Sequence, residues 1–484
     1  MKSPIIIWHR RDLRTRDNRA LSEAANTTSH IIPIFVFDPY FWESDVYCHD
    51  RLEFLLQSIE DLDKQYEKLG NKLILLHGKA VRELTKLSRN FGAEVFFNHD
   101  TNGEYGMKRD QAAIDLGFTA WQNDAIERNG RTSDWSSNTA KFFNSDTYTT
   151  PTNLSPHTLD STVTTDDIRK IYSIKPSKTS PEKGGSTQAH LRLEEFLASI
   201  KQYTKSISKP LAAETGTSRL SAHFSLGTIS IREVYQATQA LEAKQKSFYT
   251  TRLFWNQHFT QKLHDNPSLD RIAANPVFES SYDKIYQPDE KLFQSWCEGK
   301  TGYPLVAASM RALATTGFLN FRMRAMTASF LTYILKQPWQ WGADFMFYHL
   351  IDADRAINYS QWQMQSGMVG VHPNRIYNPT TNLHKHDPDA AYVRKYVPEL
   401  AKANLDFIMA DPETRQDTLF GDSYFSPIVS FTDEMRKARS IYKDLNQQAF
   451  DLIQSDHDLR AKLSLSGAAA KRTKNKQLPD TKEV

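Results

Sequence analysis

Four stretches in the second half of the chain decide its fold: GKTGYPLV at residues 299–306, FRMRAMTASFL at 321–331, LIDADRAINYSQWQMQSG at 350–367 and RIYNPTT at 375–381. They combine apolar residues at helical spacing with a high density of tryptophan, arginine and paired aspartates. A plain helical core does not need such charges, because a buried charge is costly unless it is paired. The stretches therefore predict an aromatic-lined, charged pocket.

The helical pattern extends well beyond these stretches. Apolar residues recur every three to four positions from residue 190 to about residue 452, as in VAASMRALATTGFLNFRMRAMTASFLTYIL at 306–335. We expect a large all-helical domain over residues 190–460. Residues 465–484 are polar and basic and lack aromatic side chains, so we expect a disordered tail there.

The first part of the chain has a different pattern. Short β-branched runs alternate with helix-period segments, as in βαβ units around a parallel sheet. The runs occupy residues 5–8, 31–37, 73–76 and 94–97, and a helical segment covers 52–69. We therefore expect a doubly wound α/β parallel-sheet domain over residues 1–130. Residues 131–189, rich in Ser, Thr, Asn and Pro, are expected to form an interdomain linker.

Length and composition exclude several classes of protein. A chain of 484 residues with 39% hydrophobic residues can fill the cores of two or three globular domains. No run approaches the roughly 18 apolar residues of a membrane span, and the N-terminus becomes charged too early for a signal peptide. We expect a soluble, cytoplasmic protein with no membrane partner. The formal charge of +3 neither supports nor excludes nucleic acid, because local clusters of Lys and Arg would have to supply the attraction.

The metal-binding residue types are sparse. Cys48 and Cys297 are the two cysteines and lie far apart in sequence, so one chain cannot assemble a disulfide framework or a four-cysteine zinc or iron–sulfur site. His372, His384 and His386 are close in sequence, but loop histidines are more often solvated than functional, and their spacing suggests no metal site. No metal is expected.

Two further motifs are WHRRDLRTRDN at residues 8–18 and TSRLS at 217–221. The hydroxyls and amides of TSRLS suit a phosphate at a helix start, although an ordinary helix N-cap has the same composition. Together with the four stretches quoted first, these motifs resemble the cryptochrome/photolyase family over most of the chain. The resemblance implies an FAD-binding helical domain, and the low cysteine count disfavours the iron–sulfur branch. The charges of residues 8–18 are expected to organise the first strand-to-helix turn and the domain interface.

The resemblance assigns residues to the FAD diphosphate. In the family, the TSRLS motif holds that diphosphate. The match here is complete at Thr217, Ser218, Arg219, Leu220 and Ser221. Tyr203 stands upstream, at an altered spacing, where the family has a phosphate-contacting tyrosine.

Other residues are assigned to the flavin ring. Arg324 and Asp352 match an ion pair beside the isoalloxazine, and Asp354 matches a carboxylate at its polar edge. A purely structural salt bridge is the alternative, and the two roles are compatible because an ion pair beside a flavin also tunes it. Asn358 matches the asparagine that faces a flavin nitrogen and favours the reduced anionic flavin. In a helix, Asn358 and Trp362 share one face, since they are four residues apart.

A chain of aromatic residues is implied for electron transfer. Trp362 and Trp339 match the first two members of the tryptophan chain through which an external donor reduces the excited flavin. The third position holds Tyr286. A tyrosine can be oxidised when its proton has an acceptor, so the chain is expected to end on Tyr286 or to divert through Trp341. Photoreduction is predicted to survive with altered final steps.

The mouth of the predicted pocket departs from the patterns of the family. Trp255 matches a pocket tryptophan, but Arg252 stands where photolyases acting on cyclobutane dimers have a glutamate, and Met364 replaces a second stacking tryptophan. Further changes are Asn256 for an arginine, Ala325 for a methionine, and Asn320 and Phe321 near the paired histidines of enzymes acting on (6-4) photoproducts. We interpret Trp255, Arg252 and Met364 as an altered lesion pocket. The alternative is a cavity that binds no lesion.

Two further ligands are considered. DNA would be held by cations around the cavity, which contact phosphates on either side of an extruded base; the candidates are Arg322, Arg375 and Lys385. Family members often carry a second, antenna chromophore of the folate or deazaflavin type in the α/β domain. Residues 98–105 loosely resemble the stretch that contacts it, with Glu104 as the candidate contact.

We therefore predict a blue-light-driven photolyase that uses reduced FAD to split pyrimidine dimers in UV-damaged DNA. The alternative is a cryptochrome-type photoreceptor that acts through a signalling partner without repairing DNA. The changed pocket favours this alternative, whereas the short tail and Asn358 count against it. A light-independent flavoprotein or DNA-binding module would leave Trp362 and Trp339 without a purpose. A monomer is expected.

Overall fold

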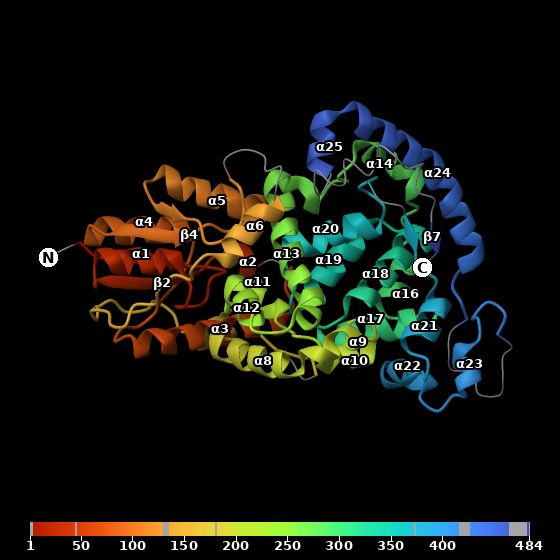
Figure 1. The fold of residues 1–484 in the computed structure, drawn as a ribbon, viewed down its shortest axis with the longest axis horizontal. Coiled ribbons are helices and arrows are strands. Elements are labelled where there is room, and N and C mark those ends of the chain that lie inside the picture. Colours follow the sequence, from red (N-terminus) through yellow and green to blue (C-terminus); the bar gives the residue numbers. More distant parts are fainter. Residues whose placement is uncertain are drawn as a thin grey trace.

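The chain folds into an α/β part followed by a larger helical part, which Figure 1 shows from the red N-terminal end to the blue C-terminal end. The structure is a computed structural model. It describes residues 3–43, 46–128, 135–179, 182–371, 374–415, 426–463 and 482–483. The two parts confirm the fold class predicted from the sequence.

The α/β part is built on a parallel five-stranded sheet with the order β3-β2-β1-β4-β5. The strands are β1 (Ile5–His9), β2 (Ile31–Phe37), β3 (Ile74–His77), β4 (Glu94–Asn98) and β5 (Thr119–Trp121). β1 lies at the centre, where Ile5 is in register with both Ile31 of β2 and Glu94 of β4. In such doubly wound sheets, ligands bind beyond the carboxyl ends of the strands, where the strand order reverses.

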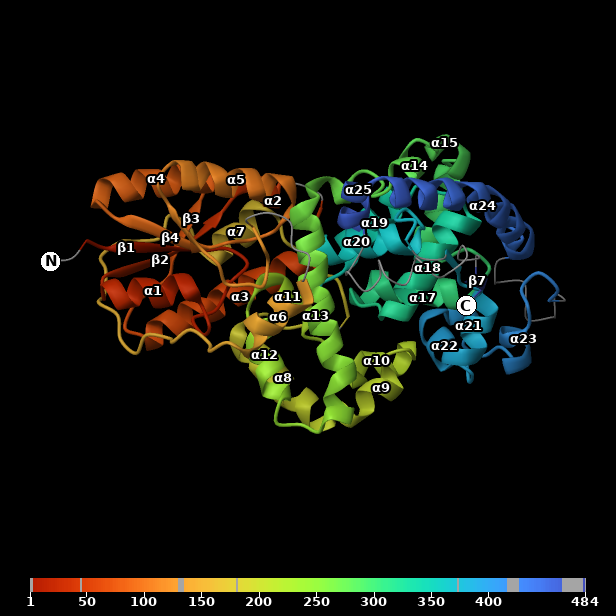
Figure 2. The same cartoon turned by 45° about the horizontal axis from the view of Figure 1, so that its top comes forward.

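Helices cover both faces of this sheet. They are α1 (Arg19–Thr27), α2 (Pro39–Trp42), α3 (His49–Lys68), α4 (Ala80–Phe91) and α5 (Gly103–Asp115). Successive strand residues face opposite sides, so Ile5 and Ile7 pack in one core with α1 and α3, while Ile6 and Trp8 pack in another with α4 and α5. Figure 2 shows the strands between these two helix layers. Burial on both faces explains why the strands are almost continuously apolar.

The helical part follows a segment that contains two helices of its own, α6 (Trp135–Asn144) and α7 (Thr165–Ile171). Its first half comprises α8 (Ser186–Ser199), η1 (Ile200–Gln202), α9 (Tyr203–Ser206), α10 (Pro210–Gly216), α11 (Ser221–Leu226), α12 (Ile231–Thr238), α13 (Ala243–Asp265), η2 (Pro267–Asp270), α14 (Pro276–Glu279), α15 (Tyr282–Ile285) and α16 (Glu290–Cys297). Its second half comprises α17 (Pro304–Thr316), α18 (Phe321–Ser329), η3 (Phe330–Ile334), α19 (Trp339–His349), α20 (Arg355–Gln365), β6 (Arg375–Ile376), α21 (Pro379–His386), α22 (Ala391–Tyr396), η4 (Pro398–Leu400), α23 (Leu405–Met409), α24 (Phe431–Ser455), α25 (His457–Leu463) and β7 (Lys482–Glu483).

Helix α17 forms the centre of the helical core. It starts with Pro304 at its first turn, and Gly317, with φ of +68°, caps its end. Nearly all of its residues up to Leu313 are buried, as expected for a helix that is apolar all round and lies inside a large core. The buried π-helical turn η3 continues α18 toward α19.

The loop after β1 joins the two parts through hydrogen bonds from its arginine side chains to backbone carbonyls of the helical part. The Arg14 guanidinium donates to the Gly227 carbonyl at 2.8 Å, and Arg11 Nε donates to the Ser225 carbonyl at 2.8 Å. Gly227 has φ of +64°, and a Cβ there would lie 2.0 Å from the Arg11 carbonyl oxygen. Only glycine therefore fits at this crossing.

A buried ion pair adds to this interface. Asp17, in the left-handed region with φ of +46°, accepts hydrogen bonds from Arg232 and Ser230 of the helical part. The Arg232 side chain is 2% exposed and the Asp17 side chain 2% exposed, so water does not compete for the pair. The charges of residues 8–18 thus hold the domain interface, as the motif predicted.

The remaining predictions about organisation are not decided by the fold. The domain limits 1–130, 131–189 and 190–460 stay predictions. Of the predicted tail, residues 465–481 and 484 lie outside the described residues, while Lys482 and Glu483 pair with Arg375 and Ile376 as β7 and β6. None of the described helices is long and apolar enough to cross a membrane.

The substitution Asp17→Asn is expected to lower the free energy of unfolding by about 3–5 kcal/mol, because it leaves the buried Arg232 guanidinium without its counter-charge. Urea unfolding followed by circular dichroism measures the loss. Arg16→Ala is the control: the Arg16 side chain is 61% exposed in its pair with Glu233, and the variant should lose about 1 kcal/mol or less. Equal losses in the two variants would contradict the role of the buried pair.

Candidate functional site

The TSRLS segment forms the tight connection between α10 and α11. Thr217 caps α10, and its hydroxyl donates to the Ala213 carbonyl at 2.8 Å. Arg219 has φ of +56°, its Nε donates to Glu182 at 2.5 Å, and its guanidinium lies 3.7 Å from the centre of the Phe318 ring. The Arg219 side chain therefore holds the shape of the connection.

Neighbouring side chains complete this connection. Arg192 donates to the carbonyl oxygens of Thr217 at 3.4 Å and Ser218 at 3.2 Å. Leu220 is fully buried, and Ser221, which begins α11, is exposed. The structure thus keeps the motif together as one backbone turn.

Two buried tyrosines lie beside the same turn. Tyr203 and Tyr249 meet edge to face, with ring centroids 5.5 Å apart. The Tyr249 hydroxyl lies near Ser218, is buried and has no well-formed hydrogen bond among the described residues. Burial raises the pKa of Tyr203, and the Arg252 guanidinium beside its hydroxyl opposes this effect. Arg252, although exposed, is therefore close to the TSRLS turn.

Arg324 and Asp352 form the ion pair that the sequence predicted. Arg324 Nη2 donates to both carboxylate oxygens of Asp352 at 2.9 Å, and its Nε donates to the Leu319 carbonyl at 2.6 Å. Burial alone would raise the pKa of Asp352, but Arg324 and the hydrogen bonds from Arg324 and Ser221 hold it below its usual value. The pair therefore brings α18, the loop after α19 and the start of α11 together.

Asp354 has two structural partners. As the N-cap of α20 it accepts from the Ile357 amide at 3.1 Å, and its other oxygen accepts from Arg11 at 2.6 Å. The first interaction fixes the start of the helix, because a capping side chain satisfies an amide that has no partner within the helix. The second ties that helix to the α/β part. The sequence did not predict this pair, because Arg11 and Asp354 belong to motifs that lie far apart in the chain.

Asn358 and Trp362 lie one turn apart on α20, as predicted. Asn358 is 9% exposed, and its amide nitrogen donates to the Ala343 carbonyl of α19 at 3.0 Å. Trp362 is 3% exposed and packs against α19 at Gly342, where a Cβ would lie 2.2 Å from the indole. Glycine at this position lets the indole reach α19.

The predicted electron-transfer residues are all buried. Trp339 is 1% exposed and begins α19 three residues before Gly342. Tyr286 is 3% exposed, and its hydroxyl contacts the Met368 sulfur at 3.4 Å. Burial raises the pKa of Tyr286 well above its usual value. The Trp362 indole therefore contacts the helix that Trp339 begins, and the position of Tyr286 is that of an apolar core residue.

Trp296 is an aromatic neighbour of Trp362 that the sequence did not assign. The two rings meet edge to face with centroids 6.3 Å apart. Phe293 connects Trp296, at 6.0 Å, to Trp341, at 5.3 Å. This path leads to Trp341, which the sequence analysis gives as the alternative end of the electron-transfer chain. Trp341 is partly exposed.

The three pocket-mouth candidates lie in different surroundings. Trp255 on α13 is half-buried and stacks on Phe259, with centroids 5.7 Å apart, while Arg252 is exposed one turn earlier on the same helix. Met364 packs against the apolar cluster formed by Val369 and the C-terminal helices α24 and α25. Its place in a lesion pocket stays a prediction.

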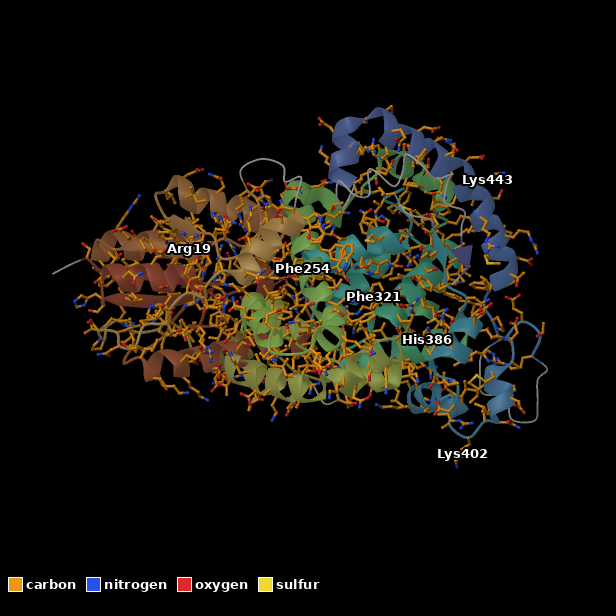
Figure 3. The ribbon with its side chains drawn as sticks, viewed as in Figure 1. Arg19, Phe254, Phe321, His386, Lys402 and Lys443 are labelled. Atoms are coloured by element: carbon orange, nitrogen blue, oxygen red, sulfur yellow. The ribbon has the colours of Figure 1, made fainter. Side chains whose placement is uncertain are left out.

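The candidate DNA contacts lie on the helical part. Figure 3 labels Phe254, which precedes Trp255 on α13, and Phe321, which precedes Arg322 on α18. Burial and the neighbouring cations Arg322, Lys385 and Lys209 lower the pKa of His386 to about 4. A cluster of positive charge therefore lies between α18 and α21. Arg375 is exposed on β6.

A cavity of about 100 Å³ opens beyond the carboxyl end of the sheet. Its lining includes Trp8, Arg10, Asp38, Trp42, Asn102 and Arg109. Glu104, the candidate antenna contact, instead pairs with Lys108 at 2.7 Å and Arg271 at 2.5 Å. Asn102, two residues earlier, is the member of residues 98–105 that reaches the cavity together with Asp100.

Comparisons with known proteins match both the α/β part and the helical part. A family model described as the FAD binding domain of DNA photolyase matches residues 248–444, and one described as DNA photolyase matches residues 5–116. The deoxyribodipyrimidine photo-lyase of Synechococcus sp. is 29% identical, over 92% of this chain and 97% of its own. Cryptochrome-1 of Arabidopsis thaliana is 28% identical, over 91% of this chain and 70% of its own. The crystal structure of the archaeal photolyase from Sulfolobus tokodaii matches with a TM-score of 0.77 at 26% identity, over 91% of this chain and 100% of that one.

The substitution Asp352→Asn is expected to lower the free energy of unfolding by about 1–3 kcal/mol, because it leaves the partly buried Arg324 guanidinium without a counter-charge. Urea unfolding measures the change. Asp444→Asn on the exposed side of α24 is the matched control and should stay within about 0.5 kcal/mol of the parent chain. A loss no larger than that of the control would show that the ion pair does not stabilise the site.

Proposed function

Because this chain belongs to the cryptochrome/photolyase family, we propose that it is a blue-light-driven DNA photolyase that repairs UV-induced pyrimidine dimers with reduced FAD. The observation that carries the proposal is the fixed amide of Asn358, buried and bonded to the Ala343 carbonyl. With its nitrogen donating to Ala343, the amide offers its oxygen as an acceptor for an N–H group of a reduced flavin. Repair needs the cofactor in that state.

The residues present fit an FAD cofactor. The buried Tyr249 hydroxyl beside Ser218 lacks a well-formed hydrogen bond among the described residues, and a buried hydroxyl needs a partner. A phosphate oxygen of FAD would supply one. Tyr203 and residues 217–221 would hold the diphosphate, and Arg324, Asp352, Asp354 and Asn358 would surround the isoalloxazine. The lowered pKa of Asp352 keeps that carboxylate charged, so a fixed negative charge would lie beside the flavin ring and tune it.

Reduced FAD would supply the light-excited electron that splits the bonds of the dimer. The chain itself binds and positions the DNA. Trp255 would stack on an extruded base, and Arg252 would meet a phosphate or the face of that base. Arg322 and Arg375 would hold phosphates on the flanking backbone. Met364 would complete the pocket on the side of α20.

Three aromatic residues would return electrons to the site when the cofactor is oxidised. Trp362 and Trp339 are held by the contact between α19 and α20. Tyr286 or Trp341 would follow as the sequence predicts. Trp362, Trp339 and Tyr286 are buried, and Trp341 lies partly exposed at the end of the path through Trp296 and Phe293.

A cryptochrome-type photoreceptor is the second candidate, and the specific observation in its favour is Arg252. A guanidinium stands here in place of the carboxylate of the family's cyclobutane-dimer photolyases. Because it lies close to the Tyr203 hydroxyl, it would be near the FAD diphosphate. In that case a change at the flavin would be transmitted to a partner protein, and no bond in DNA would be broken. The same FAD-binding residues serve both functions.

The cavity beside β1 is the candidate site for a second chromophore of the folate or deazaflavin type. The Sulfolobus tokodaii structure is described as containing two FAD molecules, with the implication of a novel light-harvesting cofactor. The cavity of about 100 Å³ is smaller than ordinary ligand pockets of about 300–1,000 Å³. Side chains such as Arg109, whose guanidinium lies 5.1 Å from the Trp8 ring centre, would have to move on binding.

Repair is tested with chemically reduced, FAD-loaded protein under blue light. The substrates are single- and double-stranded oligonucleotides that carry either a cyclobutane dimer or a (6-4) photoproduct. We expect light-dependent loss of one lesion and an about fivefold or larger fall in repair by Arg252→Ala, since a lost arginine contact to DNA costs about 1–3 kcal/mol. Lys402→Ala is the control, because Lys402 lies at the far edge of the helical part (Figure 3). No repair of either lesion by protein with bound, reduced FAD would favour the photoreceptor.

The second chromophore is tested by denaturing purified protein and identifying the released molecules by absorption and mass spectrometry. We expect FAD together with a folate or a deazaflavin, because the cavity beside β1 combines aromatic and cationic groups. Release of FAD alone, from protein purified after growth with both compounds available, would refute this assignment and leave the FAD assignment intact.

A further inference from the structure

Tyr359 lies directly beside the predicted electron-transfer residue Trp339. The two rings meet edge to face, with centroids 6.5 Å apart and an interplanar angle of 79°. Tyr359 is on α20 one turn before Trp362, whose indole packs against α19 at Gly342. Trp362, Trp339 and Tyr359 therefore gather at one helix contact, that of α19 with α20.

Tyr359 has a proton acceptor. Its hydroxyl donates to an oxygen of Asp344 at 2.5 Å, a short charge-assisted hydrogen bond of the kind along which a proton can move. Tyr359 is 4% exposed, whereas Asp344, on α19, is exposed. Partial burial of the carboxyl group and the neighbouring Asp270 raise the pKa of Asp344, against the opposing hydrogen bond from Tyr359 and the charge of Arg355. The acceptor therefore binds a proton more readily than an ordinary carboxylate and connects the buried phenol to water.

Arg355 favours loss of that proton. Its guanidinium lies 5.6 Å from the centre of the Tyr359 ring and donates to Asp270 at 2.7 Å. A fixed positive charge beside the ring disfavours a phenol radical cation but has little effect on a neutral phenoxyl radical. Oxidation of Tyr359 would thus be coupled to transfer of its proton to Asp344.

Tyr286, at the third family position, has different surroundings. Its hydroxyl contacts the Met368 sulfur at 3.4 Å and lies near Tyr442 and the backbone of Trp339. A thioether, a phenol and a peptide group are poor bases. Among the described residues, Tyr286 therefore has no carboxylate or imidazole to take its proton.

We propose that Tyr359 is the terminal internal electron donor and that Asp344 accepts its proton, an inference that rests on the proposed light-driven reduction of the flavin. Trp362 would give one electron to the excited, oxidised flavin and be refilled from Trp339, and Trp339 would be refilled from Tyr359. The Tyr359 O–H bond breaks as its proton passes to Asp344, which leaves a neutral phenoxyl radical and a carboxylic acid. A thiolate in solution then gives one electron to Tyr359 and becomes a thiyl radical, and Asp344 returns the proton.

The test uses the full chain loaded with oxidised FAD. Time-resolved absorption and electron paramagnetic resonance follow the radicals that form after a flash of blue light. The parent chain should show a tryptophan radical that is replaced by a phenoxyl radical. Tyr359→Phe should remove the phenoxyl signal. The tryptophan radical would then recombine with the flavin, and the lifetime of the protein radical should fall by about tenfold or more. Asp344→Asn keeps a hydrogen-bond acceptor but no base, and should lower the phenoxyl yield by a similar factor.

Two variants make the result specific. Tyr105→Phe is the matched control, because the Tyr105 hydroxyl also donates to a carboxylate, Asp38, at 2.9 Å in the α/β part; it should keep the phenoxyl signal. Tyr286→Phe tests the competing donor. A phenoxyl signal that persists in Tyr359→Phe and disappears in Tyr286→Phe overturns the proposal. So does a parent chain that forms tryptophan radicals alone.

The outcome is separable from that of the repair proposal. Repair is measured on chemically reduced protein, which does not need the internal donors. Normal repair without a phenoxyl radical would refute the role of Tyr359 alone. A phenoxyl radical without repair would refute the photolyase proposal and retain the donor chain.

Discussion

The charged loop after β1 is the constraint on which the site depends. Its Arg11 binds the carboxylate of Asp354 at 2.6 Å, and the same carboxylate caps α20. The orientation of α20, with Asn358 and Trp362, is therefore set by a residue of the α/β part. The buried pair of Asp17 and Arg232 fixes the same interface from α12, so the two parts cannot shift independently without exposing unpaired charges.

The contact of α19 with α20 is the second constraint. Gly342 lets the Trp362 indole approach the α19 backbone, and the Ala343 carbonyl next to it accepts from Asn358. One point on α19 thus determines the position of a predicted electron carrier and of the amide predicted to face the flavin. A side chain at residue 342 would push the indole away and disturb both, because its Cβ would lie 2.2 Å from the Trp362 indole and 2.4 Å from the Leu331 side chain.

Sequence reasoning was strongest where the information is local or carried by long motifs. The period of the apolar residues predicted the parallel sheet and the helical part, and the structure brings Arg324 and Asp352 together as expected. It failed where pairing depends on how two helices cross. Tyr359 and Asp344 are 15 residues apart on different helices, and no spacing rule links them. Met364 is another example: it packs against α24 and α25, and the sequence around Met364 does not reveal where these C-terminal helices fold back.

The exchange of a carboxylate for Arg252 would change what the predicted pocket mouth can recognise. A glutamate accepts hydrogen bonds from the N–H groups of a base, whereas a guanidinium only donates and is attracted to phosphates and to oxygen-rich ring edges. A pyrimidine dimer offers carbonyl oxygens as well as N–H groups, so the reversed polarity is compatible with a lesion read from its acceptor side. Arg252 also lies beside the Tyr203 hydroxyl, near the turn predicted to bind the FAD diphosphate. A cation there could serve substrate phosphate or cofactor phosphate, so Arg252 is compatible with repair and with signalling on the same scaffold.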